Sequence, residues 1–236
     1  MRIAALIPAY QAEAHVAGVL TRIAALPAPP DVLVVDDGST DGTAAVAKAA
    51  GAAVLSYTPN RGKGHALIAG FKALAGYDGV ITLDADGQHP PECIPDFVRA
   101  AERGADLVMG VRERTAAMPP LRRWANKVSS SWAGWLAGQP VPDSQCGYRF
   151  YGRALLERTP ITAGRYEVES EVIVRAARLG FRLAVIPVPT VYGDEESQLH
   201  ITTDVPRIIS VLARLTVERF APPEEMRRAA SRAART

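Results

Sequence analysis

The sequence predicts a single α/β domain built on a mostly parallel β-sheet, and two observations support this fold class. Short runs of apolar, often β-branched residues alternate with segments of helical periodicity through the first half of the chain. Runs that are apolar throughout are typical of strands buried on both faces, as in parallel sheets covered by helices. At 236 residues, with 48% apolar residues, the chain is long enough for one such domain with a sizeable core.

The predicted elements of the first half alternate between strand and helix. Each strand is a short apolar run, and the helices are recognised by apolar side chains three and four residues apart. Prolines, glycines and acidic residues separate the elements. The predicted strands cover residues 2–7, 32–35, 53–57, 79–83 and 106–111, and helices cover about 13–26, 41–50, 64–75 and the stretch after Pro90-Pro91.

The second half has a different organisation. A helix is predicted over residues 118–138, and all three tryptophans lie in it. Five large side chains share one face of this helix by their spacing: Leu121, Trp124, Val128, Trp132 and Trp135. Further elements are predicted as a strand after the polar loop 143–149, a helix at 166–179, a strand at 181–188 and an amphipathic helix at 203–220. We expect one domain over residues 1–220, followed by a polar, basic tail at 221–236.

The strand at residues 79–83 ends in two carboxylates one residue apart, Asp84 and Asp86, and Gln88 follows two residues later. Side chains alternate along an extended chain, so these three point the same way. Ligands gather at the carboxyl ends of strands in α/β proteins. Three oxygen donors suit a hard cation, which predicts Mg²⁺ or Mn²⁺ completed by water and a substrate phosphate. An exposed acidic turn is the alternative for an isolated Asp-x-Asp pattern.

Two further polar loops are predicted beside this one. Asp36 and Asp37 follow the strand 32–35, where a carboxylate can accept hydrogen bonds from a base or a ribose; a helix-capping turn is the alternative. Gly62-Lys63-Gly64 can bring backbone and charge close to a phosphate. Its spacing differs from that of a P-loop, which disfavours an ATPase, and no Gly-x-Gly-x-x-Gly follows the first strand, which disfavours a Rossmann dehydrogenase.

Basic residues predominate between residues 114 and 156, where Asp143 is the single acid. This balance predicts an anion-binding wall for phosphates. Arg149 is the leading candidate because it follows a glycine-containing loop, and Arg122 and Arg123 belong to the same set. A solvated helix face is the alternative for the last two.

Composition excludes several classes of protein. The formal net charge is +2, so the chain as a whole is not a nucleic-acid binder by charge. Pro8 and Tyr10 end the first apolar run before a signal peptide develops, and no run approaches the ~20 apolar residues of a membrane span. Cys93 and Cys146 occur in unrelated contexts, which predicts neither a disulfide framework nor a zinc site. We therefore expect a reduced, cytoplasmic protein.

The tryptophan-containing helix and the helix at 203–220 combine apolar faces with Arg and Lys. Packing in the core is the more common role of such stripes, but interfacial helices have the same composition. The pattern is compatible with peripheral contact at the cytoplasmic face of a membrane.

Four motifs occur in order along the first half: Pro8-Ala9-Tyr10, residues 34–43 with Asp36-Asp37-Gly38-Ser39, residues 60–64 with Gly62-Lys63-Gly64, and residues 83–91 with Asp84-Ala85-Asp86. Together they resemble a family 2 inverting glycosyltransferase with the GT-A fold. The Gln-His-Pro-Pro extension at 88–91 is most similar to dolichyl- or polyprenyl-phosphate sugar synthases. The likeness continues more loosely through residues 143–149 and Ser197.

The resemblance implies a nucleotide-diphosphate sugar donor, such as GDP-mannose or a UDP-sugar, a nucleotide-binding half over residues 1–111 and an acceptor half over 112–220. It implies that Pro8, Tyr10 and Asp37 line the base and ribose with Asp36 beside them, that Lys63 and Asp84 lie at the nucleotide, and that Asp84, Asp86 and Gln88 hold the metal. The family often reads Pro-x-Tyr-Asn-Glu-Glu, whereas Gln11-Ala12-Glu13 follows Tyr10 here, which weakens a nucleotide contact from Glu13.

The acceptor decides whether a general base is needed. A sugar hydroxyl requires a carboxylate to take its proton. A phosphate monoester, with a second pKa of about 6, is already ionised at pH 7 and needs cations instead. The abundance of Arg and Lys in the second half favours a polyprenyl phosphate acceptor. The predicted catalytic set is then Asp86, Asp143 and Arg149, and the predicted acceptor-phosphate contacts are Arg122, Arg123, Arg149 and Ser197.

Other functions remain open at this point. If a base is needed, Asp143 is the candidate, with Glu167, Glu169 and Glu171 behind it. A glycosyltransferase with a hydroxyl acceptor is the first alternative. A sugar-phosphate nucleotidyltransferase is less favoured because Pro8-Ala9-Tyr10 is not the glycine-rich, arginine-bearing loop that it requires. A sugar-nucleotide binding module without catalysis is the third.

Overall fold

The computed structural model describes residues 1–112, 120–189 and 201–220, apart from the side chains of residues 120–122, 201–204 and 220. Within this part of the chain, strands and helices alternate in the order that the sequence predicts. The strands are β1 (Ile3–Ala9), β2 (Asp31–Asp36), β3 (Ala53–Ser56), β4 (Gly79–Thr82), β5 (Leu107–Arg112), β6 (Arg149–Gly152) and β7 (Leu183–Val188). The helices are α1 (Val16–Ala24), α2 (Thr43–Ala49), α3 (Lys63–Ala73), α4 (Ile94–Glu102), α5 (Pro120–Ala137), α6 (Arg153–Arg158), α7 (Val168–Arg178) and α8 (Ile201–Phe220), and a short 3₁₀ turn, η1 (Pro91–Cys93), precedes α4.

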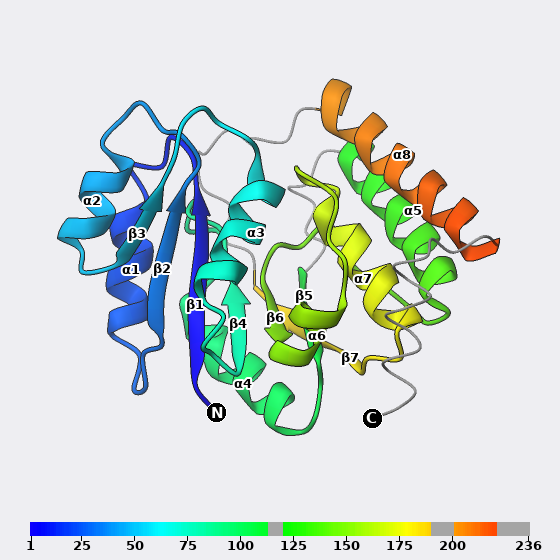
Figure 1. Ribbon diagram of the computed structural model, residues 1–236, viewed down its shortest axis with the longest axis horizontal. Coiled ribbons are helices and arrows are strands. Elements are labelled where there is room, and N and C mark those ends of the chain that lie inside the picture. Colours follow the sequence, from blue (N-terminus) through cyan, green and yellow to red (C-terminus); the bar gives the residue numbers. More distant parts are fainter. Residues whose placement is uncertain (113–119, 190–200, 221–236) are drawn as a thin grey trace.

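The described strands form one seven-stranded sheet in the order β3-β2-β1-β4-β6-β5-β7 (Figure 1). β1 is parallel to β2 and to β4, β2 is parallel to β3, and β5 is parallel to β7. β6 runs antiparallel to both β4 and β5. The predicted α/β class with a mostly parallel sheet is confirmed.

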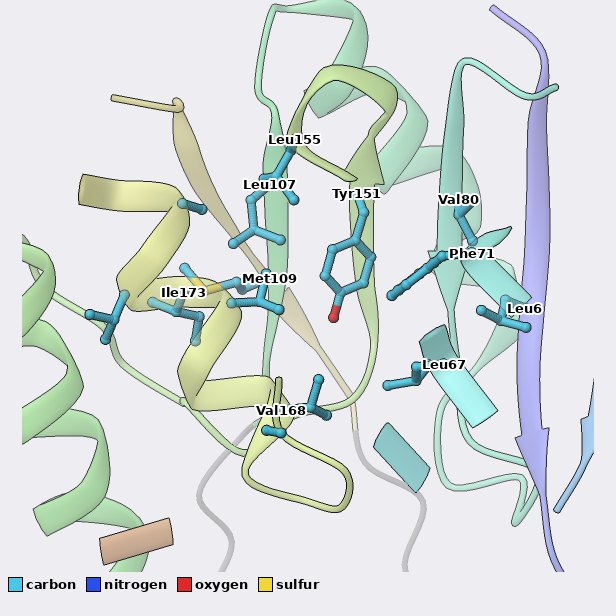
Figure 2. Packing of buried hydrophobic residues seen from close by; sticks show 14 of the residues in the cluster. Leu6, Leu67, Phe71, Val80, Leu107, Met109, Tyr151, Leu155, Val168 and Ile173 are labelled. Carbon is cyan, nitrogen blue, oxygen red and sulfur yellow. The ribbon is translucent and has the colours of Figure 1, made fainter. Parts of the chain in front are cut away.

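Helices cover both faces of the sheet because neighbouring strand residues point to opposite sides. Leu6 and Ile7 of β1 are both fully buried, but Leu6 belongs to the core cluster that includes residues of α3, α5, α7 and α8, whereas Ile7 belongs to the cluster that includes residues of α1 and α4. On the Leu6 face, Phe71 of α3 meets Tyr151 of β6 with ring centroids 5.0 Å apart (Figure 2). The result is a three-layer domain in which α1 and α2 lie toward one end of the sheet and α5, α7 and α8 toward the other (Figure 1).

The tryptophan-containing helix is present as α5, but its predicted single apolar face is divided. Trp132 is partly buried, and its indole N–H donates to the hydroxyl of Thr216 on α8 at 3.1 Å. Trp124 and Trp135 are 64% and 52% exposed. α8 packs beside α5, which buries one edge of the stripe and leaves the other at the surface (Figure 1). The side chain of Leu121 and the tail at 221–236 lie outside the described residues.

Candidate active site

The carboxyl ends of β1, β2 and β4 form one edge of the sheet, because these strands are adjacent and parallel. Pro8 is half-buried near the end of β1, and Tyr10, just after it, is 40% exposed. Asp36 ends β2, and Asp84 follows β4 by two residues. The chain order reverses between β1 and β4, and such a switch point is where α/β sheets bind ligands. The loops after β1, β2 and β4 therefore begin at the same edge, and two of them are the acidic loops predicted from the sequence at Asp36 and Asp84.

Asp84 is paired with a buried lysine at this edge. The ammonium of Lys63 lies 2.6 Å from Oδ1 of Asp84 and 2.8 Å from Oε1 of Glu169. Lys63 is the first residue of α3, and Glu169 lies in the first turn of α7. The side chains are 14% exposed for Lys63, 27% for Asp84 and 3% for Glu169. The Lys63 ammonium thus links the loop after β4 to the first turn of α7, in the second half of the chain.

Mutual attraction keeps both members of this pair charged. Burial by itself raises the pKa of Asp84, but the Lys63 ammonium outweighs it and lowers that pKa to about 2. Burial by itself lowers the pKa of Lys63, whereas Asp84 and Glu169 raise it well above its usual value. His89, whose Nδ1 is 3.6 Å from Oδ2 of Asp84, is uncharged at neutral pH because burial lowers its pKa to about 4.

Asp86 and Gln88 continue the same loop and are half-buried. Oδ1 of Asp86 accepts a hydrogen bond from the backbone N–H of Gln88 at 3.0 Å. Two carboxylates and an amide make an all-oxygen donor set, which suits a hard divalent cation, and Asp84 already attracts a cation in Lys63. No cluster of three His, Cys, Asp or Glu side chains with metal-binding geometry occurs among the described residues. The oxygen donors of the loop are those that a hard divalent cation prefers, and such a cation would need further ligands from water or substrate phosphates.

Asp37 is buried and orders the basic loop that precedes α3. Its carboxylate accepts hydrogen bonds from the backbone N–H groups of Arg61 at 2.8 Å and Gly62 at 2.7 Å, and from the side-chain amide of Asn60 at 3.0 Å. Asp36 is buried too, and it accepts a backbone N–H in the turn after β2. In this structure both carboxylates shape the loops around the predicted nucleotide position.

The glycines on either side of Lys63 are required by packing. A Cβ on Gly64 would lie 2.5 Å from the carbonyl oxygen of Ala163, and a Cβ on Gly62 would lie 2.6 Å from the side chain of Arg165. Gly62 also has a φ of +99°, which side chains other than hydrogen disfavour. The glycines fit α3 against residues 163–165, so only Lys63 of this motif brings charge to the site.

Asp143 is bound on both oxygens by Arg112, the last residue of β5. Nε of Arg112 lies 2.7 Å from Oδ2, and Nη2 lies 3.0 Å from Oδ1. Burial by itself raises the pKa of Asp143, but the two hydrogen bonds from Arg112 outweigh it, and the pKa is lowered. A carboxylate with a lowered pKa and both oxygens occupied is a poor proton acceptor. This pairing argues against Asp143 as the general base.

Arg149 does not face an acceptor in this structure, which corrects the role predicted for it. Its side chain is fully buried, and its guanidinium donates to three backbone carbonyl oxygens: Cys146 at 2.8 Å, Glu169 at 2.6 Å and Ser144 at 2.8 Å. The predicted contact failed because the antiparallel β6 places Arg149 between the 143–148 loop and α7, and sequence spacing does not reveal that enclosure.

The other predicted phosphate contacts stay predictions. Arg123 is exposed on α5. Arg122 belongs to the same helix, but its side chain lies outside the described residues, as does all of Ser197.

The sequence argument missed one charged residue of this region, Arg112, and did not foresee the ion pair of a second, Glu169. Arg112 has the same sequence signal as Asp84, which is a charged side chain at the carboxyl end of an apolar strand. That signal could have identified it. Glu169 was considered only as a reserve base, among alternating acids at residues 167–171. Its partner Lys63 is 106 positions away in sequence, so no local pattern pairs them.

The sheet order and the acidic loops at its carboxyl edge define a class of α/β proteins that bind nucleotides. A family model described as "Glycosyl transferase family 2" matches residues 4–163. The chain belongs to this family and is a glycosyltransferase enzyme, as the resemblance in its motifs predicted. The nucleotidyltransferase and the binding module without catalysis are thereby set aside.

Two relatives and one solved structure illustrate the likeness. The polyprenol monophosphomannose synthase of Mycolicibacterium smegmatis is 32% identical over 81% of this chain and 77% of its own. The undecaprenyl-phosphate mannosyltransferase of Micrococcus luteus is 34% identical over 80% of this chain and 83% of its own. The glucosyl-3-phosphoglycerate synthase of Mycobacterium tuberculosis, crystallised with Mn²⁺, UDP and glucosyl-3-phosphoglycerate, superposes with a TM-score of 0.75 at 24% identity, over 90% of this chain and 79% of its own. That likeness shows the GT-A fold.

Proposed function

We propose that this glycosyltransferase transfers a sugar, with inversion, from a nucleoside-diphosphate donor to a polyprenyl phosphate. The observation that carries the proposal is that cations hold two of the candidate bases, Asp143 and Glu169. Asp143 is bound by Arg112, and Glu169 is bound by Lys63. A hydroxyl acceptor needs a free carboxylate as base, whereas an ionised phosphate attacks without one. The two relatives above, which are named for polyprenol- or undecaprenyl-phosphate transfer, support the same acceptor.

The donor is proposed to bind at the carboxyl edge of β1, β2 and β4. Pro8, Tyr10, Asp36 and Asp37 would surround the base and ribose, with guanine and uracil as the candidate bases. Lys63 would contact the diphosphate, since its ammonium is adjacent to Asp84.

Asp84, Asp86 and Gln88 would hold Mg²⁺ or Mn²⁺. When bound, this cation neutralises negative charge on the departing nucleoside diphosphate. Lys63 adds a buried positive charge at the same loop, and a buried charge acts more strongly than an exposed one. Arg112 and Asp143 form an ion pair at the start of the 143–148 loop, in which Gly147 lies close to both Lys63 and the carboxylate of Asp84.

Transfer to a hydroxyl acceptor is the second candidate function, and the observation that favours it concerns Glu167. It is buried at the start of α7, and its Oε2 has no hydrogen-bond partner among the described residues. Glu171, by contrast, accepts hydrogen bonds from Thr162 and Ala163 and pairs with Arg175.

An acceptor panel separates the two functions. We expect the purified protein, supplied with Mn²⁺ and GDP-mannose or UDP-glucose, to glycosylate polyprenyl phosphate but not polyprenol or simple sugars. The measurement is transfer of radiolabelled sugar into the lipid fraction. Transfer to polyprenol or a simple sugar that is lost in Glu167→Gln would establish the hydroxyl-acceptor alternative instead.

We also propose that α5 and α8 rest on an anionic membrane surface. Trp124, Trp135 and Val217 are 64%, 52% and 67% exposed, and the guanidinium of Arg219 lies over the Trp135 ring at 4.7 Å. α5 contains no acidic residue. Apolar side chains flanked by cations are typical of interfacial helices. Among the residues that the structure describes, no helix has the length and apolar character of a membrane span.

Replacing both exposed tryptophans tests this surface. We expect Trp124→Ser with Trp135→Ser to weaken binding to phosphatidylglycerol vesicles by about tenfold or more, because each indole contributes on the order of 1 kcal/mol when buried in the interface. Vesicle flotation measures it. Val185→Ser, which removes a 48% exposed apolar side chain from β7, is the matched control and should bind as the wild type does. Equal binding by all three proteins would show that the surface does not contact lipid.

A further inference from the structure

The Lys63 ammonium has two carboxylate partners, and only one of them lies on the proposed metal loop. Its distances to Asp84 and Glu169, 2.6 Å and 2.8 Å, are both those of direct ion pairs. Glu169 is the more deeply buried partner, with 3% of its side chain exposed. Its own backbone carbonyl is fixed by the guanidinium of Arg149 at 2.6 Å. Glu169 is therefore a rigidly placed anion behind the metal loop.

The ammonium is confined to the space between these carboxylates. A Cβ on Gly147 would lie 2.6 Å from Nζ of Lys63 and 3.1 Å from both carboxylate oxygens of Asp84. The carbonyl of Gly147 accepts the hydroxyl of Thr82 at 2.7 Å, which ties this backbone to β4. With only 14% of its side chain exposed, Lys63 has little room to move away when a new cation approaches Asp84.

A divalent cation on Asp84 competes with the ammonium for the same carboxylate. Separating a buried ammonium from its counter-ion is strongly unfavourable unless another anion holds it. Glu169 is that anion, because it already contacts Nζ and lies outside the loop of Asp84 and Asp86. The three charges of Lys63, Asp84 and Glu169 add to a net negative site, whereas Lys63 and Asp84 alone would be neutral.

We propose that Glu169 is a positioning residue for Lys63, which retains the ammonium when a divalent cation takes over Asp84. Glu169 thereby makes Asp84 available to the metal and keeps Lys63 at the donor diphosphate. This inference rests on the metal site of the proposed function. It assigns Glu169 a role other than taking a proton from the acceptor.

Titration with Mn²⁺ alone, followed by electron paramagnetic resonance, tests the proposal without measuring turnover. We expect Glu169→Gln to weaken Mn²⁺ binding by about tenfold or more, since the metal must then leave a buried ammonium without a carboxylate partner. Glu157→Gln, the same chemical change at an exposed glutamate of α6 that pairs with Arg153, is the control and should leave the affinity unchanged. Wild-type affinity in Glu169→Gln would overturn the inference, while absence of Mn²⁺ binding in the wild type would overturn the metal site as well.

The Lys63→Met background separates positioning from a direct attraction between Glu169 and the metal. If Glu169 acts through Lys63, adding Glu169→Gln to Lys63→Met should change the Mn²⁺ affinity less than about twofold, because the two residues are coupled. A full tenfold loss in that background as well would overturn the inference in favour of a simple electrostatic field.

A crystal structure of the wild type with Mn²⁺ provides a measurement that does not depend on the folding of any variant. Nζ of Lys63 should remain within hydrogen-bond distance of Glu169 and should have left Asp84, which then ligates the metal. An ammonium that stays on Asp84, or that leaves Glu169, would overturn the proposal.

Discussion

Asp86→Ala is expected to abolish sugar transfer while the protein remains folded. The side chain is half-buried on the loop after β4, and its carboxylate is one of two that would hold the divalent cation. A bound metal contributes several kcal/mol of charge stabilisation to a departing phosphate group, so we expect the turnover number to fall by at least about 10³-fold. The measurement is radiolabelled transfer under saturating donor and acceptor, beside circular dichroism of the purified variant.

Asp96→Ala is the matched control for this experiment. It removes an aspartate from the exposed side of α4, where the residue pairs only with its neighbour Arg99 among the contacts described. Such surface pairs contribute at most about 1 kcal/mol, so activity and stability should be close to wild type. A folded Asp86→Ala protein with near-normal turnover would refute the metal assignment at this loop, and with it the proposed chemistry of donor departure.

Arg149→Met is expected to destabilise the protein by at least about 3 kcal/mol, since three buried carbonyl oxygens lose a charged donor and each such hydrogen bond contributes about 1.5 kcal/mol or more. Those carbonyls belong to Cys146, Glu169 and Ser144, so the variant loosens the 143–148 loop from the start of α7. Urea unfolding followed by circular dichroism measures the free energy of unfolding.

Arg153→Met serves as the comparison for Arg149→Met. Arg153 is half-buried at the start of α6 and pairs with Glu157 one helical turn away, an arrangement that contributes roughly 0.5 kcal/mol. The same substitution should therefore be nearly neutral there. If Arg149→Met instead kept wild-type stability and raised only the KM for the phosphorylated acceptor, the acceptor contact predicted from the sequence would be restored.

The sequence determined the fold class and the positions of the acidic loops with little help from tertiary structure. Apolar runs that end in acids at residues 36–37 and 84–86 are local signals, and the parallel pairing of β1, β2 and β4 follows from the helices between them. Parallel strands must end at a common edge, so the loops had to meet there. The metal role of Asp84, Asp86 and Gln88 stays a prediction, and the extended chain on which it was based is a turn at Ala85 and Asp86 in the structure.

The pairing of charges was decided only by the tertiary structure. Arg149, predicted to face a phosphate, is enclosed by backbone carbonyls because β6 inserts antiparallel between β4 and β5. Arg112 binds Asp143, which argues against the base role considered for that carboxylate, and Lys63 of α3 pairs with Glu169 at the start of α7. An ion pair depends on distances of a few ångströms between segments that can be a hundred residues apart, whereas a strand or an acidic turn depends on its own neighbours. The sequence by itself therefore predicted which acidic loops meet at one edge of the sheet, and the fold decided how their charges are paired.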